Sequence, residues 1–554
     1  MRKERKSRFE TLSGIEIKPV YRPDDHWYFR DLPEEVRKII LADYHQRLGD
    51  PGEFPFARGV FEGGFRIQLP TIREFSGRNL APDTNTHLHY LLGIGQKGLS
   101  IAYDAPTIHG RDSDNEKWSL GYVGKDGVAV DTFADFQNLF SGIPRGKYSL
   151  SQTINLPAIV FLGMDLLLAK EQGIPFRELR GTLQNDILKE IISQKLYSFP
   201  LRHGMRLVGD MMEYCIKNLD PGYYPINFSG YHMGEAGASP IQELAITVKN
   251  GLTYFDFLVG ERGLPADETA LRMSAYFNCK GLWEEIAKYR AARRMWALEL
   301  WSRGVRNPRA LGLRFHVQNS GASFKRQEPG NNVIRGTIHA LAALIGGANS
   351  VHLNSFDEEV ALPSDEAVKE AIRTLQICSE EMNITDTVDP MGGSYYVEWL
   401  TDKMEDGARE IFRNIDDLGG MMRAIELGFP QLEIHAQSQK EAEAVDAKEL
   451  VVVGINKYFD VKNQACEERK VYRKALRIPT MDAHNRQKER VARVKAGRDE
   501  GKVDVSLRRL ADEARGKGIL VEPVMEAVAA YATVEEIMFG ALEPVFGHWR
   551  GPGD

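Results

Sequence analysis

The sequence has few cysteines and no long apolar run, and each absence excludes a class of protein. No C-x-x-C pair occurs, so neither a zinc site nor a disulfide framework is indicated, and this usage fits a reducing cytoplasm. No uninterrupted apolar stretch reaches the roughly 20 residues of a membrane-spanning helix. No apolar segment follows the charged N-terminus, so we expect no secretory signal. The four cysteines lie far apart, at Cys215, Cys279, Cys378 and Cys466.

A surplus of basic residues is also missing. The net charge is -7 over 554 residues, whereas a nucleic-acid-binding protein needs a basic face. We therefore expect no nucleic-acid partner and no membrane contact. Hydrophobic residues make up 43% and charged residues 27%, as in ordinary soluble globular proteins. The length allows a large barrel with smaller elements around it.

Short β-rich runs alternate with longer helical stretches from about residue 65 onward. Residues 159–171, 241–249 and 333–344 show the apolar periodicity of helices. Eight such β/α alternations predict an α/β fold of the parallel (β/α)8, or TIM, barrel type. The eight expected strands are Phe65–Phe75, Gly98–Asp104, Tyr148–Asn155, Glu178–Asp186, Tyr224–His232, Leu252–Val259, Leu311–Gln318 and Asn349–Asn354.

Three regions are expected along the chain. Residues 1–60 predict an arm, broken by prolines, with one helix after Asp31 as its cap. The apolar stripe of that helix either docks on a partner or packs on its own domain. Residues 61–400 predict the barrel. Residues 401–554 predict a small helical region with a charged linker over 457–502 and amphipathic helices over 507–514 and 524–546. The stripe is Val36, Ile39, Ile40 and Tyr44.

Polar side chains gather at the C-terminal ends of the expected strands, the face on which barrel enzymes build their sites. Polar residues also interrupt the strands, as at Gln152, Thr153, Arg314 and His316. A filled barrel would carry bulky aliphatic residues there, so we expect an interior that admits a ligand. The polar strand ends are Asp104, Asn155, Gln184, Asn185, Asp186, His232, His316, Gln318 and Asn354.

The segment Ser229–Gly237 combines glycines with a Tyr-His pair directly after one expected strand. Its glycines allow close backbone approach, as a site packed against a large ligand requires. The imidazole of His232 can donate a hydrogen bond to a carbonyl oxygen. A glycine-rich turn with a satisfied core histidine is the alternative, but the many polar strand ends on the same face favour a functional role.

Several strings stand out along the chain, among them Thr182–Glu190, Ser229–Gly237 and His352–Glu358. They resemble the large subunit of the adenosylcobalamin-dependent acyl-CoA mutases, the methylmalonyl-CoA mutase family. The resemblance implies a radical isomerase in which an acyl-thioester group migrates to the neighbouring carbon, with chemistry carried by the cofactor. It also implies that the pantetheine arm of coenzyme A runs along the barrel axis. The strings are Thr11–Val20, Gly95–Ser100, Asp112–Asp114, Thr182–Glu190, Ser229–Gly237, His352–Glu358 and Gly454–Tyr458.

The resemblance also implies roles for individual residues. His232 would donate to the thioester carbonyl and stabilise charge on it, Gln184 would lie beside the reacting acyl group, and Tyr231 would be a further catalytic residue. Residues implied in cofactor binding are Asn354 and Glu358, which match positions at the adenosyl ribose, together with Gly77 and Glu235. Residues implied along the coenzyme A path are Arg272, Ser274, His316 and Gln318. No residue is implied as a metal ligand.

Substrate choice depends on a few positions, Thr182 among them. Phe75 and Gln194 match positions that hold a tyrosine and a carboxylate-gripping arginine in methylmalonyl-type members. A buried carboxylate needs a charged partner, which Gln194 cannot supply. The Phe/Gln pair resembles the isobutyryl-CoA type instead. The 2-hydroxyisobutyryl type, with an aspartate at the position of Ala102, is the second reading, and simple core packing is the alternative for Phe75.

Other positions depart from the family. Gln68 and Leu69 replace a usual arginine and aromatic residue, residues 76–83 differ from the usual string, and Arg111 stands where tyrosine is usual. We expect these changes near the substrate and the entrance for coenzyme A, which leaves the acyl group open.

The family's cobalt-ligand motif, D-x-H-x-x-G, has no complete match. Residues 24–26, 43–45 and 482–484 begin like it, but none has the glycine. We therefore expect no cobalamin-binding domain in this chain, and a separate small subunit that supplies the cobalt ligand. By resemblance, two large and two small subunits would form the active enzyme. A non-catalytic barrel partner of a related mutase, and an unrelated barrel isomerase or lyase, are the alternatives.

Overall fold

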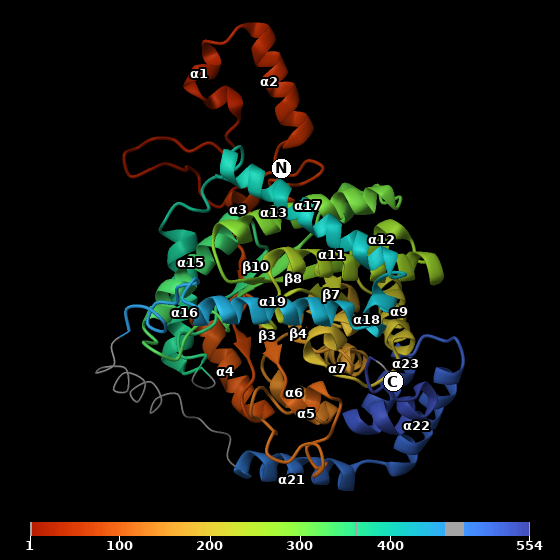
Figure 1. The fold of residues 1–554 in the computed structure, drawn as a ribbon. Coiled ribbons are helices and arrows are strands. Elements are labelled where there is room, and N and C mark those ends of the chain that lie inside the picture. The colour runs from red at the N-terminus through yellow and green to blue at the C-terminus, as the bar shows by residue number, and fades with distance from the viewer. Residues whose placement is uncertain (1–2, 360–362, 460–480, 553–554) are drawn as a thin grey trace.

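Parallel strands form the centre of the computed structural model, which describes residues 3–359, 363–459 and 481–552 (Figure 1). The strands form two five-stranded sheets, in the orders β1-β10-β9-β8-β7 and β2-β3-β4-β5-β6. The strands are β1 (Thr71–Ile72), β2 (Phe75–Ser76), β3 (Leu99–Ala102), β4 (Leu150–Thr153), β5 (Gly181–Leu183), β6 (Tyr223–Tyr224), β7 (Ile226–Ser229), β8 (Met273–Cys279), β9 (Phe315–Asn319) and β10 (Ser350–His352).

The two sheets meet at two interrupted runs of chain. Two residues separate β1 from β2, and Pro225, which has no N–H to donate, separates β6 from β7. The backbone N–H of Asn227 in β7 donates to the carbonyl of Gln184, just after β5, at 2.9 Å. Counted as single runs, the strands follow one another in sequence order, as in a (β/α)8 barrel. The pairing forms two sheets rather than one continuous ring.

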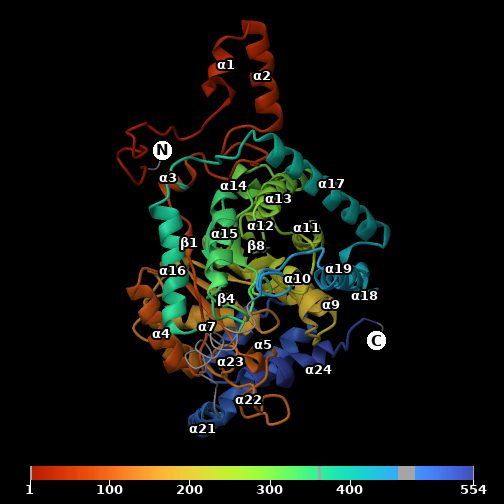
Figure 2. The ribbon, with the colours of Figure 1, turned by 60° about the vertical axis from the view of Figure 1, so that its left-hand side comes forward.

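Helices cover the strands from outside (Figures 1 and 2). Two large apolar clusters lie between the strands and these helices. The expected helical stretches are confirmed as α7, α11 and α15. The helices of the body are α3 (Gly64–Ile67), α4 (Ala81–Gly93), α5 (Ala105–Ile108), α6 (Phe133–Leu139), α7 (Ala158–Glu171), α8 (Ile187–Lys189), α9 (Leu201–Asn218), α10 (Tyr231–Glu235), α11 (Pro240–Asp256), α12 (Ala266–Ala270), α13 (Trp283–Ser302), α14 (Pro308–Leu311), α15 (Asn331–Ile345), α16 (Asp365–Glu380), α17 (Tyr395–Asp417), α18 (Met421–Glu426) and α19 (Phe429–Asp446). Of these, α17 packs on α11 and α13.

The sixth expected strand, Leu252–Val259, was wrong. These residues end α11 and enter a π-helical turn, η4 (Phe257–Glu261). A capping box between Ser239 and Gln242 starts α11, and the helix continues through residues that favour strands. The strand is β8 instead, whose residues are buried on both faces, so it shows no alternation. The first expected strand also began too early, because residues 64–67 form α3.

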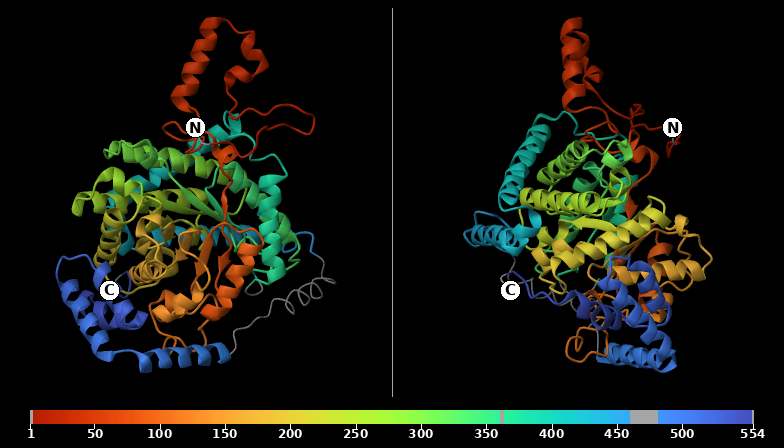
Figure 3. Two further views of the ribbon diagram at one scale, coloured as in Figure 1. Left: turned by 180° about the vertical axis from the view of Figure 1, so that it is seen from behind. Right: turned by 90° about the vertical axis from the view of Figure 1, so that its right-hand side faces the viewer.

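The N-terminal arm projects from the body as a pair of helices, α1 (Trp27–Arg30) and α2 (Glu34–Arg47), after the short turn η1 (Pro23–Asp25) (Figures 1 and 3). Pro33, not Asp31, occupies the N-cap of α2. Val36 and Ile39 are exposed, and Tyr44 is buried at the base of the arm. Most of the stripe is therefore not covered by its own domain.

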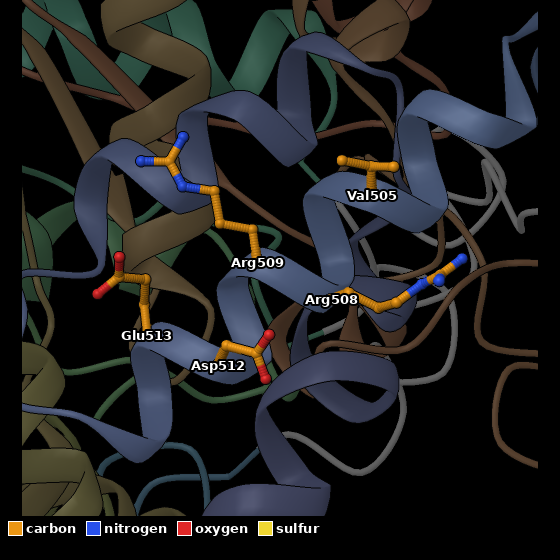
Figure 4. Close-up of a pocket in the computed structure, with 5 residues that line it drawn as sticks. All are labelled: Val505, Arg508, Arg509, Asp512 and Glu513. Atoms are coloured by element: carbon orange, nitrogen blue, oxygen red, sulfur yellow. The ribbon is translucent and has the colours of Figure 1, made fainter.

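Among the C-terminal helices, α23 packs on α7 and α9, and α22 packs on α23; these helices are coloured blue in Figure 3. The C-terminal helices are α21 (Met481–Gly497), α22 (Glu500–Arg515), α23 (Val521–Ala529), η5 (Glu536–Leu542) and α24 (Glu543–Phe546). The expected helices over 507–514 and 524–546 are confirmed as helical, the second in three pieces. Part of the expected charged linker, 460–480, lies outside the described residues. Figure 4 shows a shallow cavity on α22, lined by Val505, Arg508, Arg509, Asp512 and Glu513.

Cys215, Cys279 and Cys378 are free and buried. Across residues 3–359, 363–459 and 481–552, no cluster of metal-binding side chains occurs. Over the same residues, no helix combines the length and apolar character needed to cross a bilayer.

A buried ion pair ties the barrel wall to its outer helices. Arg145 donates from Nε and Nη2 to both carboxylate oxygens of Asp165 in α7, at 2.6 and 2.9 Å. The hydroxyl of Tyr223 in β6 donates to the same carboxylate at 3.1 Å. Burial of all three makes the pair costly to break, because removal of one partner leaves an uncompensated charge.

We expect Arg145→Met to lower the free energy of unfolding by about 3–5 kcal/mol, because it leaves Asp165 buried and unpaired. The matched control is Arg509→Met, which removes an exposed pair with Glu526 and should cost at most about 1 kcal/mol. Denaturant unfolding followed by tryptophan fluorescence measures both. Equal losses in the two variants would contradict this ranking.

Candidate active site

The short helix α10 carries His232, and glycines set its position. The Gly230 N–H donates to the carbonyl of Tyr276 in β8 at 2.7 Å. A Cβ on Gly230 would lie 2.3 Å from Thr247 Oγ1, and one on Gly234 would lie 2.5 Å from Asn278 Nδ2. Close approach is confirmed, but the neighbours are side chains of this chain. The expectation that these glycines face a large ligand was therefore wrong.

His232 lies in α10 rather than at the end of a strand, since β7 ends at Ser229. Its Nδ1 is 3.1 Å from Ser229 Oγ, which leaves Nε2 for another partner. Burial first, and the positive charge of Lys189 second, hold the pKa of His232 well below its usual range. The ring is therefore neutral near pH 7 and has one N–H to donate. Tyr231, next to it, stacks on Tyr276 at 5.0 Å between ring centroids.

Two predicted site residues, Gln184 and Gln194, meet at a buried lysine. Lys189 Nζ donates to Gln184 Oε1 at 2.8 Å and to Gln194 Oε1 at 2.7 Å. The carboxylate of Glu190 also accepts from this ammonium and balances its charge. Lys189 is fully buried, Gln184 is buried and Gln194 is exposed. Lys189 is a site residue that the sequence reasoning missed.

Small side chains form a layer across one half of the barrel wall. Register pairs connect Phe75, Ser100, Ser151, Thr182 and Tyr224 in adjacent strands. The next layer pairs Ala102 with Thr153. Several of these residues, Thr182 and Ala102 among them, are only partly buried although they lie within the barrel wall. The small members of the layer, Ser100, Ser151 and Thr182, contrast with the bulky layers that fill most such barrels, although Phe75 and Tyr224 at its ends are large.

Gln152 belongs to the opposite face of β4. It is buried, and it accepts a hydrogen bond from the hydroxyl of Tyr103 at 2.6 Å. The expectation that it lines the interior was therefore wrong, because alternate residues of a strand face opposite sides of the sheet.

Polar residues expected along the coenzyme A path line the other half. His316 pairs in register with Tyr276, and its Nδ1 is 2.8 Å from Ser350 Oγ. Gln318 follows two residues later and donates from Nε2 to Asn354 Oδ1 at 2.7 Å. Ser274 accepts from Asn227 Nδ2 at 2.8 Å. These side chains form one polar ladder along β8 and β9.

Arg272, just before β8, is occupied by protein partners. It is buried, pairs with Glu268 at 2.6 Å and donates to the carbonyl of Leu219 at 2.9 Å. Its Nε is buried without a partner among the described residues. Arg272 therefore has one free donor, its Nε–H, at the N-terminal end of β8.

Three of the residues expected to bind the cofactor surround Gly321. A Cβ built there would lie 3.2 Å from Glu235 Oε2, 3.3 Å from Asn354 Nδ2 and 4.0 Å from Glu358 Cγ. Two carboxylates and an amide are suitable partners for the hydroxyls of a ribose, so this cradle fits the adenosyl group of the expected cofactor. Gly77 packs elsewhere, where its Cβ would lie 2.0 Å from the carbonyl oxygen of Ala102.

A basic cavity of 730 Å³ opens at the N-terminal ends of the strands. Ser149 and Arg180 directly precede β4 and β5, and Thr71 begins β1. None of Lys97, Lys147 and Arg180 is paired with a carboxylate of the described residues, whereas Arg5 and Lys6 both bind Asp386. Unpaired cations of this kind suit a phosphate-bearing ligand. The sequence reasoning missed all five basic residues of this cavity.

The comparisons with known proteins agree with this geometry. The family model described as methylmalonyl-CoA mutase matches residues 10–548. The chain belongs to the methylmalonyl-CoA mutase family. Members of this family are CoA mutases, which are isomerases that depend on adenosylcobalamin.

The relatives do not separate the possible substrates. The chain is 38% identical over 550 residues to the 2-hydroxyisobutanoyl-CoA mutase large subunit of Aquincola tertiaricarbonis, covering 99% of this chain and 93% of that protein. It is 38% identical over 545 residues to the methylmalonyl-CoA mutase of Escherichia coli K12, covering 98% and 72%. The human mitochondrial methylmalonyl-CoA mutase is 38% identical over 546 residues, with 98% and 69% covered.

The positions that depart from the family separate into two groups. Gln68 and Leu69 line the basic cavity, at the expected entrance for coenzyme A. Arg111 does not. It pairs with Glu535 at 2.8 Å and lies over the ring of Phe539, so it anchors the C-terminal helices.

A buried His-Glu pair beside Phe75 was also missed. His352 Nδ1 is 2.9 Å from Glu74 Oε2, and the His352 ring meets the Phe75 ring edge to face with centroids 4.8 Å apart. Burial opposes protonation of His352, but the charge and hydrogen bond of Glu74 outweigh it and raise the pKa above its usual value of 6.5. The pair therefore contributes stability below pH 6.5 and loses it as the pH rises through the raised pKa.

Glu74→Gln should accordingly lower the melting temperature most at low pH. We expect a loss of about 2–4 °C at pH 6 that shrinks as the pH rises through the raised pKa of His352. Differential scanning calorimetry across this range measures the difference. Glu116→Gln, on the surface, serves as the control. A loss that stays constant with pH would show that His352 is not charged in the native protein.

Proposed function

We propose that this chain is the substrate-binding, catalytic large subunit of an acyl-CoA mutase that interconverts isobutyryl-CoA and butyryl-CoA. The contact between Gln194 and Lys189 carries the proposal. Its buried cation, Lys189, is balanced by Glu190 and already donates to two amide oxygens. A carboxylated acyl group would find no unbalanced charge there. Phe75 adds an apolar wall without a hydroxyl.

A 2-hydroxyisobutyryl substrate is less well supported. Ala102 has no group that could accept from the substrate hydroxyl. The first acid after β3, Asp104, is the buried N-cap residue of α5, and the N–H groups of Thr107 and Gly124 already donate to it at 3.0 and 2.7 Å. It is therefore committed to the backbone.

His232 is proposed to donate from its free ring nitrogen to the thioester carbonyl during migration. A neutral imidazole suits this role, because it stabilises developing negative charge without a complete proton transfer. Gln184 would lie beside the acyl group, and Thr182 would line the pocket next to it. Tyr231, stacked on Tyr276, would close the side toward the cofactor.

Adenosylcobalamin would bind above the C-terminal ends of the strands. When bound, it supplies a carbon-centred radical by homolysis of its cobalt–carbon bond. Asn354, Glu235 and Glu358 would hold the ribose hydroxyls in the cradle at Gly321, and Gly77 would be a further contact. The chain's own task is to hold the acyl group still and to exclude water.

Coenzyme A is proposed to enter at the basic cavity and to pass along the barrel. The unpaired cations Lys97, Lys147 and Arg180 would bind its phosphates. The polar ladder of Ser274, His316 and Gln318 would hydrogen-bond the pantetheine arm, and Arg272 would add its spare donor. The acyl group would then reach Gln184 and His232 at the other end.

The cobalt ligand is proposed to come from a separate small cobalamin-binding subunit, in a dimer of heterodimers in the cytoplasm. The relative from Aquincola tertiaricarbonis is itself named a large subunit. The exposed stripe on α2 would serve as a subunit contact of the arm (residues 1–60). Residues 61–400 would act as the barrel domain and 401–554 as the helical region.

The deciding experiment combines this chain with a small cobalamin-binding subunit and adenosylcobalamin. Isobutyryl-CoA, 2-hydroxyisobutyryl-CoA and methylmalonyl-CoA are offered separately, and products are followed by mass spectrometry. We expect butyryl-CoA from the first substrate. His232→Ala should fold and bind coenzyme A, yet lose about 10²-fold or more in turnover. Turnover of another acyl-CoA alone would overturn the proposed substrate.

Removal of the unpaired cations tests the coenzyme A path. Lys147→Ala combined with Arg180→Ala should weaken coenzyme A binding by about tenfold or more, because two phosphate partners are lost. The effect should shrink at high salt, which screens exposed charges. Lys403→Ala, an exposed lysine paired with Asp406, is the control. Titration calorimetry measures all three, and unchanged affinity would place the nucleotide elsewhere.

A further inference from the structure

The ammonium of Lys189 is the centre of a buried polar cluster. Its Nζ contacts amide oxygens of Gln184 and Gln194 and the carboxylate of Glu190. Asn155 Nδ2 also donates to Gln184 Oε1, at 2.9 Å, and to Glu190 Oε1, at 2.5 Å. The cluster therefore joins a strand-end residue from β4 to the segment after β5.

Chemistry fixes which way the two glutamine amides face. An ammonium group has donors only, so the amide atom against it must be oxygen. Gln184 Oε1 receives a second donor from Asn155, which strengthens the same orientation. The NH₂ groups of both glutamines then point away from Lys189, and no donation from them occurs within the described contacts. Each amide is a fixed donor with a free N–H.

The local backbone brings the lysine to Gln194. Residues Glu190–Gln194 form a π-helical turn, η3, which ends at Lys195 with a positive φ of 56°. A π-turn places residues i and i+5 together, and Lys189 and Gln194 are five apart. An ordinary α-helical turn would direct Gln194 away from the ammonium. The π-turn therefore brings the Gln194 amide to the ammonium of Lys189.

We propose that Lys189 is a positioning residue that sets acyl specificity, by holding Gln184 and Gln194 with their NH₂ groups toward the acyl group. This inference rests on the proposed function and deepens it. The site would then offer neutral donors to the thioester end and would reject a carboxylate, because Glu190 already balances the charge of Lys189. The selectivity for uncharged acyl groups would thus come from a cation whose charge Glu190 already neutralises.

The charged and titratable groups around the lysine are few. Asp186 and Glu190 belong to its own segment, His232 comes from α10, and Tyr254 of α11 donates to Asp186 at 2.8 Å. Burial raises the pKa of Glu190, and Lys189 lowers it in part. Lys189 also contributes to the low pKa of His232. Loss of the ammonium should therefore raise the pKa of His232.

The test uses the full chain and the double variant Lys189→Met/Glu190→Gln, which removes both charges at similar volume. Calorimetry compares isobutyryl-CoA with coenzyme A itself. In the wild-type chain we expect the thioester to bind more tightly than coenzyme A. In the double variant that gain should fall by about tenfold, with coenzyme A affinity unchanged. Lys249→Met, which breaks the pair with Asp416, is the matched control and should keep the gain.

Turnover of the reconstituted enzyme supplies a second readout. In the double variant kcat should drop, and the acid limb of its pH profile should move to higher pH because His232 titrates higher. If Lys189 only stabilised the fold, the folded double variant would bind isobutyryl-CoA more tightly than coenzyme A by the same factor as the wild type. The acid limb of its kcat profile would also stay at the same pH. Either unchanged result in a folded variant overturns the inference.

A single variant tests the same inference even if the double variant Lys189→Met/Glu190→Gln does not fold. Glu190→Gln leaves the ammonium unbalanced, so it should gain about tenfold in affinity for methylmalonyl-CoA relative to isobutyryl-CoA. No gain would overturn the inference. Failure of the wild-type chain to bind any acyl-CoA would instead reject the proposed function, and this inference with it.

Discussion

A barrel wall built from small inward residues is the constraint on which the rest of this structure depends. Layers such as Ser100–Ser151–Thr182 do not fill the interior, so the barrel gains little stability from within. Stability has to come from the apolar clusters between wall and helices, and from buried pairs such as Arg145–Asp165. These pairs also fix how the strands sit relative to the helices. The small inward side chains and the buried contacts outside the strands are therefore linked, because the outer contacts supply the stability that the interior does not.

The two ends of the barrel axis differ in their balance of charge. At the N-terminal end, cations such as Lys147 and Arg180 have no carboxylate partner among the described residues, which suits an anionic ligand. At the other end, the cation Lys189 is balanced by Glu190 and surrounded by amides. A ligand that is anionic at one end and neutral at the other would match this gradient. Coenzyme A esters of uncharged acids have this character.

Sequence patterns predicted the α/β fold with its parallel strands, whereas the site residues came from the family resemblance and stay predictions; the features that were missed have physical causes. Strand β8 was missed because it is buried on both faces and because Leu252–Phe255 resembles a strand while continuing a capped helix. Lys189 was missed because a Lys-Glu pair is usually a solvated helix surface. The basic cavity joins residues from 5 to 380, and no local pattern shows such a convergence. Its members are known only once the strands are aligned.

Some side chains near the proposed acyl site are exposed to solvent, so the reaction requires something that covers them. Lys189 and Gln184 are buried, but Gln194 and Glu358 are exposed on the same face of the barrel. Radical chemistry needs a site closed to water. The chain supplies the floor and walls of that site, while the face that carries Glu358 stays open to solvent. The proposed small subunit and its cofactor would therefore close the site as well as supply the cobalt ligand, because a cobalamin held over this face would cover the side chains that the barrel leaves exposed.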